Sequence, residues 1–342
     1  MSQKNLNVSK KTHKFLLDKL KDRRTLEIYK KFEKNLPIKK NFIVAVSGGP
    51  DSLALSFLTK IYSIKKSINV KYYIVDHKLR KDSTNEVKFV TNLLKKLSIK
   101  LNILNWIGKK PKNNIQSIAR IKRYDLLIKE AKKFNIKSIL LAHHRGDLQE
   151  NFFIRIIRGS GLSGLVSFDK NSQIHQINLI RPLLKFDKKD LIYISKNIFD
   201  TYVEDPSNEQ EKFKRIKMRN LIKSLQAEGL NFDKFDLTIK NLKLANNSIE
   251  YFTEKNVKDN SHFFSKNKSA ILNDDFFSCP KEVVFRSFTN VLRIIGKKYY
   301  PVRGKKIDNL LQLIKLNRPF KITLGNCIIR KVNRSVIVTK EH

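Results

Sequence analysis

Residues Ser47 to Ser52 of this 342-residue chain read SGGPDS and directly follow an apolar run from Phe42 to Val46. An apolar run that ends in two glycines and a proline is typical of a buried strand, a tight loop and the first turn of a helix. The amides at such a helix start converge on one place and bind anions, and the two serine hydroxyls can add donors. The six residues therefore predict a phosphate-binding loop.

An acid stands inside this predicted anion site. The chain has no GxxxxGKS or GxxxxGKT pattern, so the lysine that holds phosphate in many such loops is missing. Asp51 would repel phosphate unless a cation lay between them, which predicts a magnesium ion bridging Asp51 to a polyphosphate. An ordinary glycine turn between a strand and a helix is the competing interpretation. The expected nucleotide-binding residues of the loop are Ser47, Gly48, Gly49, Pro50, Asp51 and Ser52.

Further polar residues follow two other apolar segments. Asp76 and His77 come after residues 70–75, and His143 comes after residues 138–142. If both segments are parallel strands of the sheet that carries the loop, these side chains lie along the same edge. Asp76 and His77 can then reach a bound nucleotide. An Asp-His pair after a strand is also common in turns, which is the competing interpretation.

Two carboxylates share one face of the next expected helix. Asp147 and Glu150 are three residues apart and close to His143. Such a pair beside a nucleotide suits magnesium or a cationic substrate, whereas the spacing is not HExxH and does not suit structural zinc. An acidic helix start favoured by the dipole would explain Asp147 but not the pair His143 and His144.

Arginines are grouped on another expected helix, 115–134. Arg120 and Arg123 are three residues apart, and Tyr124 is four residues from Arg120. Two guanidinium groups on one face can clamp a phosphate. A solvated basic face is the alternative, but arginine in a lysine-rich chain favours phosphate contact for at least one of them.

Alternating strands and helices must position these residues. Consecutive expected strands are separated by about thirty residues, which is typical of βαβ crossovers. We therefore expect an α/β fold with a doubly wound, mainly parallel sheet and a smaller C-terminal α+β domain. The expected strands are 42–46, 70–75, 101–106 and 138–142, and the expected helices lie near 52–64, 83–97, 115–134 and 147–157.

Three regions are expected along the chain. Residues 1–40 form an N-terminal helical extension, 41–222 the domain of the predicted phosphate-binding loop and 223–342 a smaller basic domain. Within the last region, residues 320–339 indicate two paired strands around a Gly-Asn turn.

The chain is strongly basic. It has 71 Lys and Arg residues against 31 Asp and Glu, which gives a formal net charge of +40. A polyanion is the natural partner of such a charge, and a single nucleotide does not require it, so nucleic acid is favoured. A mutational bias toward lysine would explain part of the excess without any function.

Cysteine content and hydropathy indicate the compartment. Cys279 and Cys327 are too few for a disulfide framework or a zinc site, which fits a reducing cytoplasm. The N-terminal segment is polar and basic, and no uninterrupted apolar run approaches the ~18 residues of a membrane span. We expect a cytoplasmic protein that is not exported and has no membrane partner.

The motifs together resemble those of a known family. SGGPDS is similar to the SGGxDS motif of the PP-loop, N-type ATP pyrophosphatases, which have an adenine nucleotide alpha hydrolase-like fold. Over roughly residues 42–220 the chain resembles the tRNA(Ile)-lysidine synthetases. The motifs that carry this resemblance, in order, are SGGPDS, VDHKLR, ARIKRY, LAHHRGDLQE, RGSGLSGL, RPLL and EDPSN.

The resemblance has departures. The family often shows HHxDDxxET, where this chain has Gly146 for the first acid and Asn151 for the threonine. After EDPSN the family tends to show Arg-Asn, whereas Arg215 is followed here by Ile216, with Arg219 one helical turn later.

The resemblance implies a ligase that forms a carbon–nitrogen bond in two steps. ATP adenylates the C2 oxygen of the wobble cytidine in the AUA-reading tRNA(Ile) with a CAU anticodon, and free L-lysine then displaces AMP to give lysidine. ATP and Mg²⁺ are implied, residues 41–222 would be the ATP-binding catalytic domain, the C-terminal part would hold tRNA, and a homodimer is left open. The residues that the resemblance makes catalytic are Asp51, Arg120, His143, Asp147 and Glu150.

Three rival functions are weighed against this one. A PP-loop tRNA thiolase would share SGGxDS but generally needs catalytic cysteines or a bound cluster, and both cysteines lie outside the expected catalytic domain. A GMP or NAD synthetase would not need a charge of +40. A catalytically silent tRNA-binding protein would leave the loop, His143 and Asp147 without a purpose.

Overall fold

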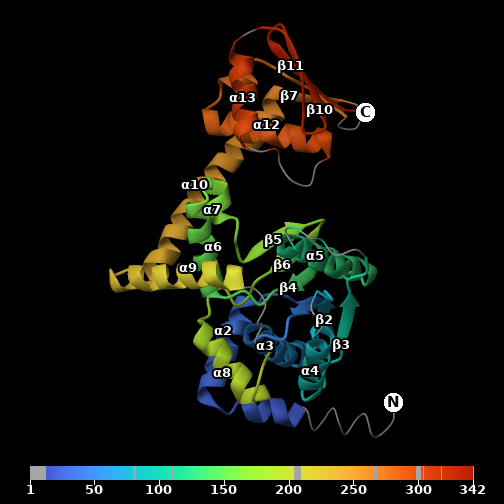
Figure 1. The fold of residues 1–342 in the computed structure, drawn as a ribbon, viewed down its shortest axis with the longest axis vertical. Helices are drawn as coiled ribbons and strands as arrows, with labels where there is room; N and C mark the ends of the chain where they lie inside the picture. Colours follow the sequence, from blue (N-terminus) through green and yellow to red (C-terminus); the bar gives the residue numbers. More distant parts are fainter. Residues whose placement is uncertain are drawn as a thin grey trace. The chain divides into compact units, whose positions relative to one another are not determined.

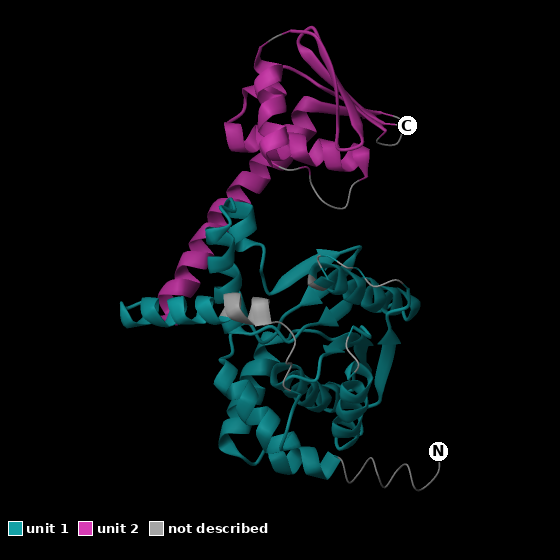
Figure 2. Ribbon diagram, viewed as in Figure 1, with its two compact units in different colours: residues 1–230 teal, residues 231–342 magenta. Residues whose placement is uncertain are grey.

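The computed structural model describes residues 13–79, 82–108, 111, 113, 115–203, 209–264, 268–297, 302, 304–316 and 318–341, without the side chains at 116 and 209–215. The EDPSN motif, 204–208, therefore lies outside the described residues. Contacts divide the chain into two compact units, residues 1–230 and 231–342 (Figure 2). The boundary expected at 222/223 falls inside α9, the last helix of the first unit.

The first unit alternates strands and helices along most of its length (Figure 1). Its elements are α2 (Arg23–Asn35), β1 (Phe42–Val46), α3 (Pro50–Lys66), β2 (Val70–Asp76), α4 (Ser83–Lys95), β3 (Leu101–Asn105), α5 (Ile115–Lys133), β4 (Ser138–Leu140), α6 (Arg145–Ile157), α7 (Leu162–Val166), β5 (Asn171–Ile174), β6 (Ile177–Ile180), α8 (Lys188–Phe199) and α9 (Glu209–Ala227).

The strands form one six-stranded sheet in the order β3-β2-β1-β4-β6-β5. Neighbouring strands pair in parallel from β3 to β6, and β5 pairs antiparallel with β6. The expectation of a mainly parallel sheet is confirmed. The β5–β6 hairpin extends the sheet beyond the four strands expected from the sequence.

Alternate residues of β1 pack on opposite faces of the sheet. Phe42, Val44 and Val46 join one buried cluster with side chains of α2, α3, α4 and α8. Ile43 joins a second cluster, which includes Leu127 of α5. Helices therefore cover both faces, as the apolar run of this strand predicts.

The N-terminal helix α2 belongs to this core. Tyr29 and Phe32 are fully buried, and the Phe32 ring meets Tyr62 of α3 edge to face with centroids 6.3 Å apart. The helical segment expected before residue 41 thus packs on the catalytic unit, and residues 1–12 lie outside the described part of the chain.

The second unit packs helices against a five-stranded antiparallel sheet in the order β7-β8-β11-β10-β9. Its elements are α10 (Phe232–Asn260), β7 (Ser261–Phe264), β8 (Ser269–Leu272), α11 (Asp275–Ser278), α12 (Lys281–Gly296), α13 (Gly304–Lys315), β9 (Phe320–Leu324), β10 (Cys327–Val332) and β11 (Ser335–Lys340).

The C-terminal strands differ in one respect from the sequence expectation. The turn at Gly325 and Asn326 is present, and both residues have positive φ. The expected second strand, however, is two strands, because the chain turns back at Asn333, which also has a positive φ of 50°. No helix among the residues described in either unit is both long and apolar enough to cross a membrane.

Candidate active site

The SGGPDS loop joins the end of β1 to the start of α3. Gly48 has a φ of +88°, which favours glycine, and a Cβ there would lie 2.6 Å from Val90 Cγ2. The buried Ser52 hydroxyl accepts hydrogen bonds from the amides of Ser47, at 3.1 Å, and Gly48, at 3.0 Å. It donates its own proton to the Gly49 carbonyl at 3.0 Å. Ser52 therefore fixes the shape of the loop, whereas the sequence suggested a donor directed at phosphate.

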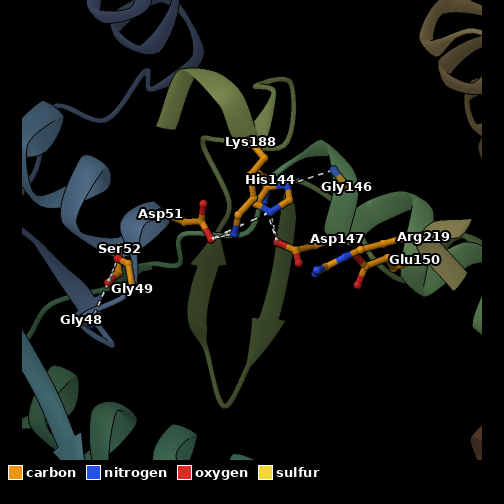
Figure 3. A network of polar contacts seen from close by, with 10 residues as sticks. All are labelled: Gly48, Gly49, Asp51, Ser52, His144, Gly146, Asp147, Glu150, Lys188 and Arg219. Carbon is orange, nitrogen blue, oxygen red and sulfur yellow. Dashed lines mark hydrogen bonds and ion pairs between the residues drawn. The ribbon is translucent and has the colours of Figure 1, made fainter. Parts of the chain in front are cut away.

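Asp51 stands in the first turn of α3, after Gly49 at the N-cap and Pro50. Its Oδ2 accepts a hydrogen bond from Lys188 Nζ at 3.0 Å (Figure 3). Its Oδ1 is buried and has no hydrogen-bond partner among the residues that the structure describes. A carboxylate oxygen without a hydrogen-bond partner at a helix start is a suitable ligand for a cation beside a phosphate.

This site fits magnesium in one particular way. Among the described residues, no group of three or more His, Cys, Asp or Glu side chains is arranged to hold a metal ion. Magnesium commonly keeps waters and binds through one or two carboxylates together with phosphates of the substrate. Asp51 thus fits as the protein ligand of an ion that takes its other ligands from a polyphosphate and water.

His144 links Asp51 to Asp147. It is the N-cap of α6 and only 4% exposed. Its Nδ1 accepts a hydrogen bond from the Gly146 amide at 3.0 Å, so the ring proton is on Nε2. That nitrogen lies 3.9 Å from Asp51 Oδ2 and 3.7 Å from Asp147 Oδ2 (Figure 3). Asp147 Oδ2 also accepts from the His144 amide at 2.9 Å, which fixes the carboxylate.

Glu150 has a charged partner that the sequence analysis did not assign to it. Its Oε1 accepts a hydrogen bond from Arg219 Nε at 2.6 Å, and its side chain is 8% exposed (Figure 3). The half-exposed Arg219 comes from α9, 69 residues away in the chain. The side chain of Arg215, expected on the same face as Arg219, lies outside the described residues.

His143 lies in a different environment from His144. Its ring meets Phe168 edge to face with centroids 5.1 Å apart, and its buried Nδ1 has no hydrogen-bond partner within the described chain. Burial lowers the pKa of His143 to about 3, against the opposing effect of Asp147, and three positive guanidinium groups lower it further. These groups belong to Arg181, Arg120 and Arg123. The imidazole is therefore neutral at neutral pH and lies within the electrostatic influence of these guanidinium groups.

Asp76 and His77 lie at the end of β2, as expected. The buried Asp76 accepts hydrogen bonds from the Lys78 amide at 2.9 Å, Ser83 Oγ at 2.9 Å and Thr84 Oγ1 at 3.0 Å. Burial raises the pKa of Asp76, but these bonds outweigh it and keep the pKa below its ordinary value. The described contacts of Asp76 therefore shape the loop before α4, and its role in nucleotide binding stays a prediction.

Two residues of this network are missing from the sequence prediction. Lys188 begins α8 and is one of 71 lysines and arginines, so its type alone carries no signal. His144 did carry a signal in the sequence. Two residues after it stands Gly146, at a position where the family often has an acid. Arg120 is exposed, and its guanidinium carbon lies 5.3 Å from the centroid of the Tyr124 ring. Its contact with phosphate stays a prediction.

Comparison with known proteins agrees with this geometry. Residues 19–225 match the PP-loop domain family. The chain is 32% identical over 301 residues to a tRNA(Ile)-lysidine synthase from Wolbachia sp. subsp. Brugia malayi, an alignment that covers 87% of this chain and 70% of the relative. It is 31% identical over 325 residues to one from Rickettsia akari, covering 92% and 74%. The chain belongs to the tRNA(Ile)-lysidine synthase family.

A solved structure shares the fold of this family member. The U34-tRNA thiolase NcsA from Methanococcus maripaludis, solved with its 4Fe-4S cluster, superposes with a TM-score of 0.56. The two chains are 14% identical, and the match covers 65% of this chain and 78% of the thiolase. At that identity the similarity concerns the fold alone. It supports the α/β architecture of the PP-loop unit.

The buried His143 predicts a pH dependence of stability. The folded protein keeps this ring neutral down to about pH 3, while an unfolded chain protonates it near its ordinary pKa of 6.5. The stability that it contributes is complete above pH 6.5 and is lost as the pH falls toward 3. Between pH 6.5 and 3 the unfolding free energy should therefore decrease with falling pH less steeply in His143→Asn than in the unmodified protein. The difference in slope should be up to about 1.4 kcal/mol per pH unit. Urea unfolding at several pH values measures this, and an unchanged slope would contradict the assignment.

Proposed function

We propose that this protein forms lysidine by attaching lysine to C2 of the wobble cytidine of the tRNA(Ile) with a CAU anticodon. Membership of the lysidine synthase family supports the reaction. One observation assigns the reaction to particular residues. The carboxylates of Asp51, in the nucleotide loop, and of Asp147 both lie within 4 Å of the His144 imidazole. A reaction that joins ATP, a base and a cationic amino acid needs a phosphate-binding loop and an ammonium-binding acid in one site.

In the first step the base is activated. The polyphosphate of ATP binds the SGGPDS loop at the positive end of α3, with arginines such as Arg120 on the α-phosphate. The C2 oxygen of the cytidine attacks the α-phosphorus, and the bond to the β-phosphate oxygen breaks, which releases pyrophosphate. Magnesium held by Asp51 and phosphate oxygens would neutralise the charge that develops on the leaving group. His143, which is neutral at neutral pH, adds no charge to this site.

In the second step lysine replaces AMP. The ε-ammonium first releases a proton to water, and the resulting amine attacks C2. The new C–N bond forms, the bond from C2 to the AMP oxygen breaks so that AMP leaves, and the nitrogen releases a second proton to water. Asp147 is the direct ammonium ligand, because its side chain is 32% exposed whereas that of Glu150 is 8% exposed. Glu150 balances the charge of Arg219 and holds it in place.

The remaining partners follow from charge and composition. The net charge of +40 suits tRNA, and we assign tRNA contact to the basic second unit, residues 231–342. We place the reaction in the cytoplasm, where tRNA, ATP and free lysine occur together. Self-association into a homodimer stays a prediction. Thiolation is not proposed, because Cys279 and Cys327 both belong to the second unit.

The test of the proposal is ATP-dependent incorporation of labelled lysine into tRNA(Ile) with a CAU anticodon. Asp51→Asn removes the proposed magnesium link but leaves the basic surface intact, so lysine incorporation and ATP–pyrophosphate exchange should both be lost while tRNA binding persists. Normal exchange in this variant would overturn the metal assignment. No incorporation by the unmodified protein would overturn the function.

Glu150→Gln separates the lysine site from the ATP site. Loss of the ion pair leaves the positive charge of Arg219 unbalanced, which should raise the KM for the lysine ammonium by roughly tenfold, corresponding to about 1.4 kcal/mol of binding. Adenylation of tRNA without lysine should stay near normal. The measurement compares adenylated tRNA formed without lysine and lysine saturation curves for both proteins. Collapsed adenylation with an unchanged KM would assign Glu150 to the ATP site instead.

The salt dependence of tRNA binding tests the meaning of the positive charge. Contacts with phosphates release counterions, so each contact contributes about −0.7 to −0.9 to the slope of log K against log salt. We expect a steep fall in affinity between low and moderate salt, measured by filter binding. An affinity that stays flat would mean that the charge of +40 is largely compositional.

A further inference from the structure

Gly146 lies against the ring of His144. A Cβ built on Gly146 would be 2.8 Å from His144 Cε1 and 3.1 Å from Nδ1, and the first distance is shorter than real Cβ contacts allow. Gly146 is the second residue of α6 and is not among the residues with positive φ. Glycine is therefore needed here for space and not for backbone conformation.

The ring of His144 has little freedom to move away from an added methyl group. It is 4% exposed, and its Nδ1 is held by the Gly146 amide at 3.0 Å. Any side chain at position 146 would break this contact or turn the ring. Glycine also lowers helix propensity by about 1 kcal/mol relative to alanine, so a fold that needed only a stable helix would not favour it.

The Nε2–H of the same ring points between two carboxylates. Its distances to Asp51 and Asp147, 3.9 Å and 3.7 Å, are too long for hydrogen bonds, so the attraction is electrostatic. Because Nδ1 accepts a hydrogen bond from the Gly146 amide, the ring proton is on Nε2. The partly positive N–H group of the ring therefore faces both acids. Other groups also hold these acids: Lys188 donates a hydrogen bond to Asp51, and the backbone amide of His144 donates one to Asp147. The neutral ring of His143 lies near Asp147.

We propose that His144 is a positioning residue that orients Asp51 and Asp147 toward the magnesium nucleotide and the lysine ammonium, and that Gly146 is required because it leaves space for the ring. This inference rests on the proposed function. It assigns a role to the glycine that stands where the family often has an acid. In this chain a carboxylate at 146 and the observed position of His144 exclude each other.

A double-mutant cycle tests the coupling. Gly146→Ala and His144→Ala should each raise the magnesium concentration needed for half-maximal ATP binding by about tenfold, a typical effect of losing a partner that orients a metal ligand. The double variant should be no worse than His144→Ala, because the added methyl group has no ring left to displace. Calorimetric titration of ATP at graded magnesium measures this without tRNA or lysine.

Two further variants control for folding and for glycine replacement. Gly161→Ala adds a methyl group at another helix start of the same unit, where nothing lies within 4 Å, and should leave ATP binding unchanged. His144→Asn keeps a good N-cap for α6 but loses the reach of the imidazole, so it should fold and still bind magnesium ATP more weakly.

The outcomes are distinguishable from failure of the proposed function. Additive effects of Gly146→Ala and His144→Ala, or unchanged or tighter magnesium ATP binding in either, would overturn the positioning role. Non-additive loss of binding in a protein that forms no lysidine would support the positioning of Asp51 and overturn the proposed function. Non-additive loss accompanied by a raised KM for lysine supports both parts.

Discussion

The site is organised by the need to balance negative charge that two acids bring to one place. Asp51 and Asp147 both approach the Nε2 of His144 within 4 Å, and such a pair is unfavourable unless positive groups lie nearby. Lys188 covers one oxygen of Asp51, and the imidazole edge faces both acids. The other oxygen of Asp51 is buried and has no hydrogen-bond partner within the described chain, and this is the oxygen that a metal nucleotide would use.

The order of strands brings these acids together. The chain runs from β1 outward to β2 and β3 and then returns to β4 on the other side of β1. Ligands of open parallel sheets bind at such a switch, beyond the carboxyl ends of the two adjacent strands. The loop with Asp51 follows β1, and the segment with His143, His144 and Asp147 follows β4. Gly48 lets the first loop pack closely against α4, because a Cβ at this position would lie 2.6 Å from Val90 Cγ2.

The two histidines divide the work between them according to their surroundings. His143 is held neutral by burial and by the positive charge of three arginines. His144 is held by a backbone amide on one side and faces acids on the other. Two neighbouring histidines thus lie in opposite electrostatic surroundings, one near guanidinium groups and one near carboxylates. The two acids of α6 also differ in their surroundings. Glu150 is buried and paired with Arg219, whereas Asp147 is partly exposed.

The sequence by itself determined the local elements and the nucleotide loop. The periodicity of apolar residues depends on immediate neighbours, so the strands at 42–46, 70–75 and 101–106 and the helices after them were predicted nearly to their ends. The sequence also placed Asp51 at the start of a helix, and Asp147 and Glu150 together on another helix. Local patterns missed the β5–β6 hairpin and the extra turn at Asn333, where polar residues interrupt the alternation.

Only the tertiary structure decided which charges meet. Lys188 reaches Asp51 across 137 residues and Arg219 reaches Glu150 across 69, and no local pattern encodes such pairs in a chain with 71 basic residues. The exchange of an acid for glycine at 146 was visible in the sequence, but its meaning depends on a Cβ position 2.8 Å from a ring carbon. Close packing fixes such distances, and composition and spacing do not contain them.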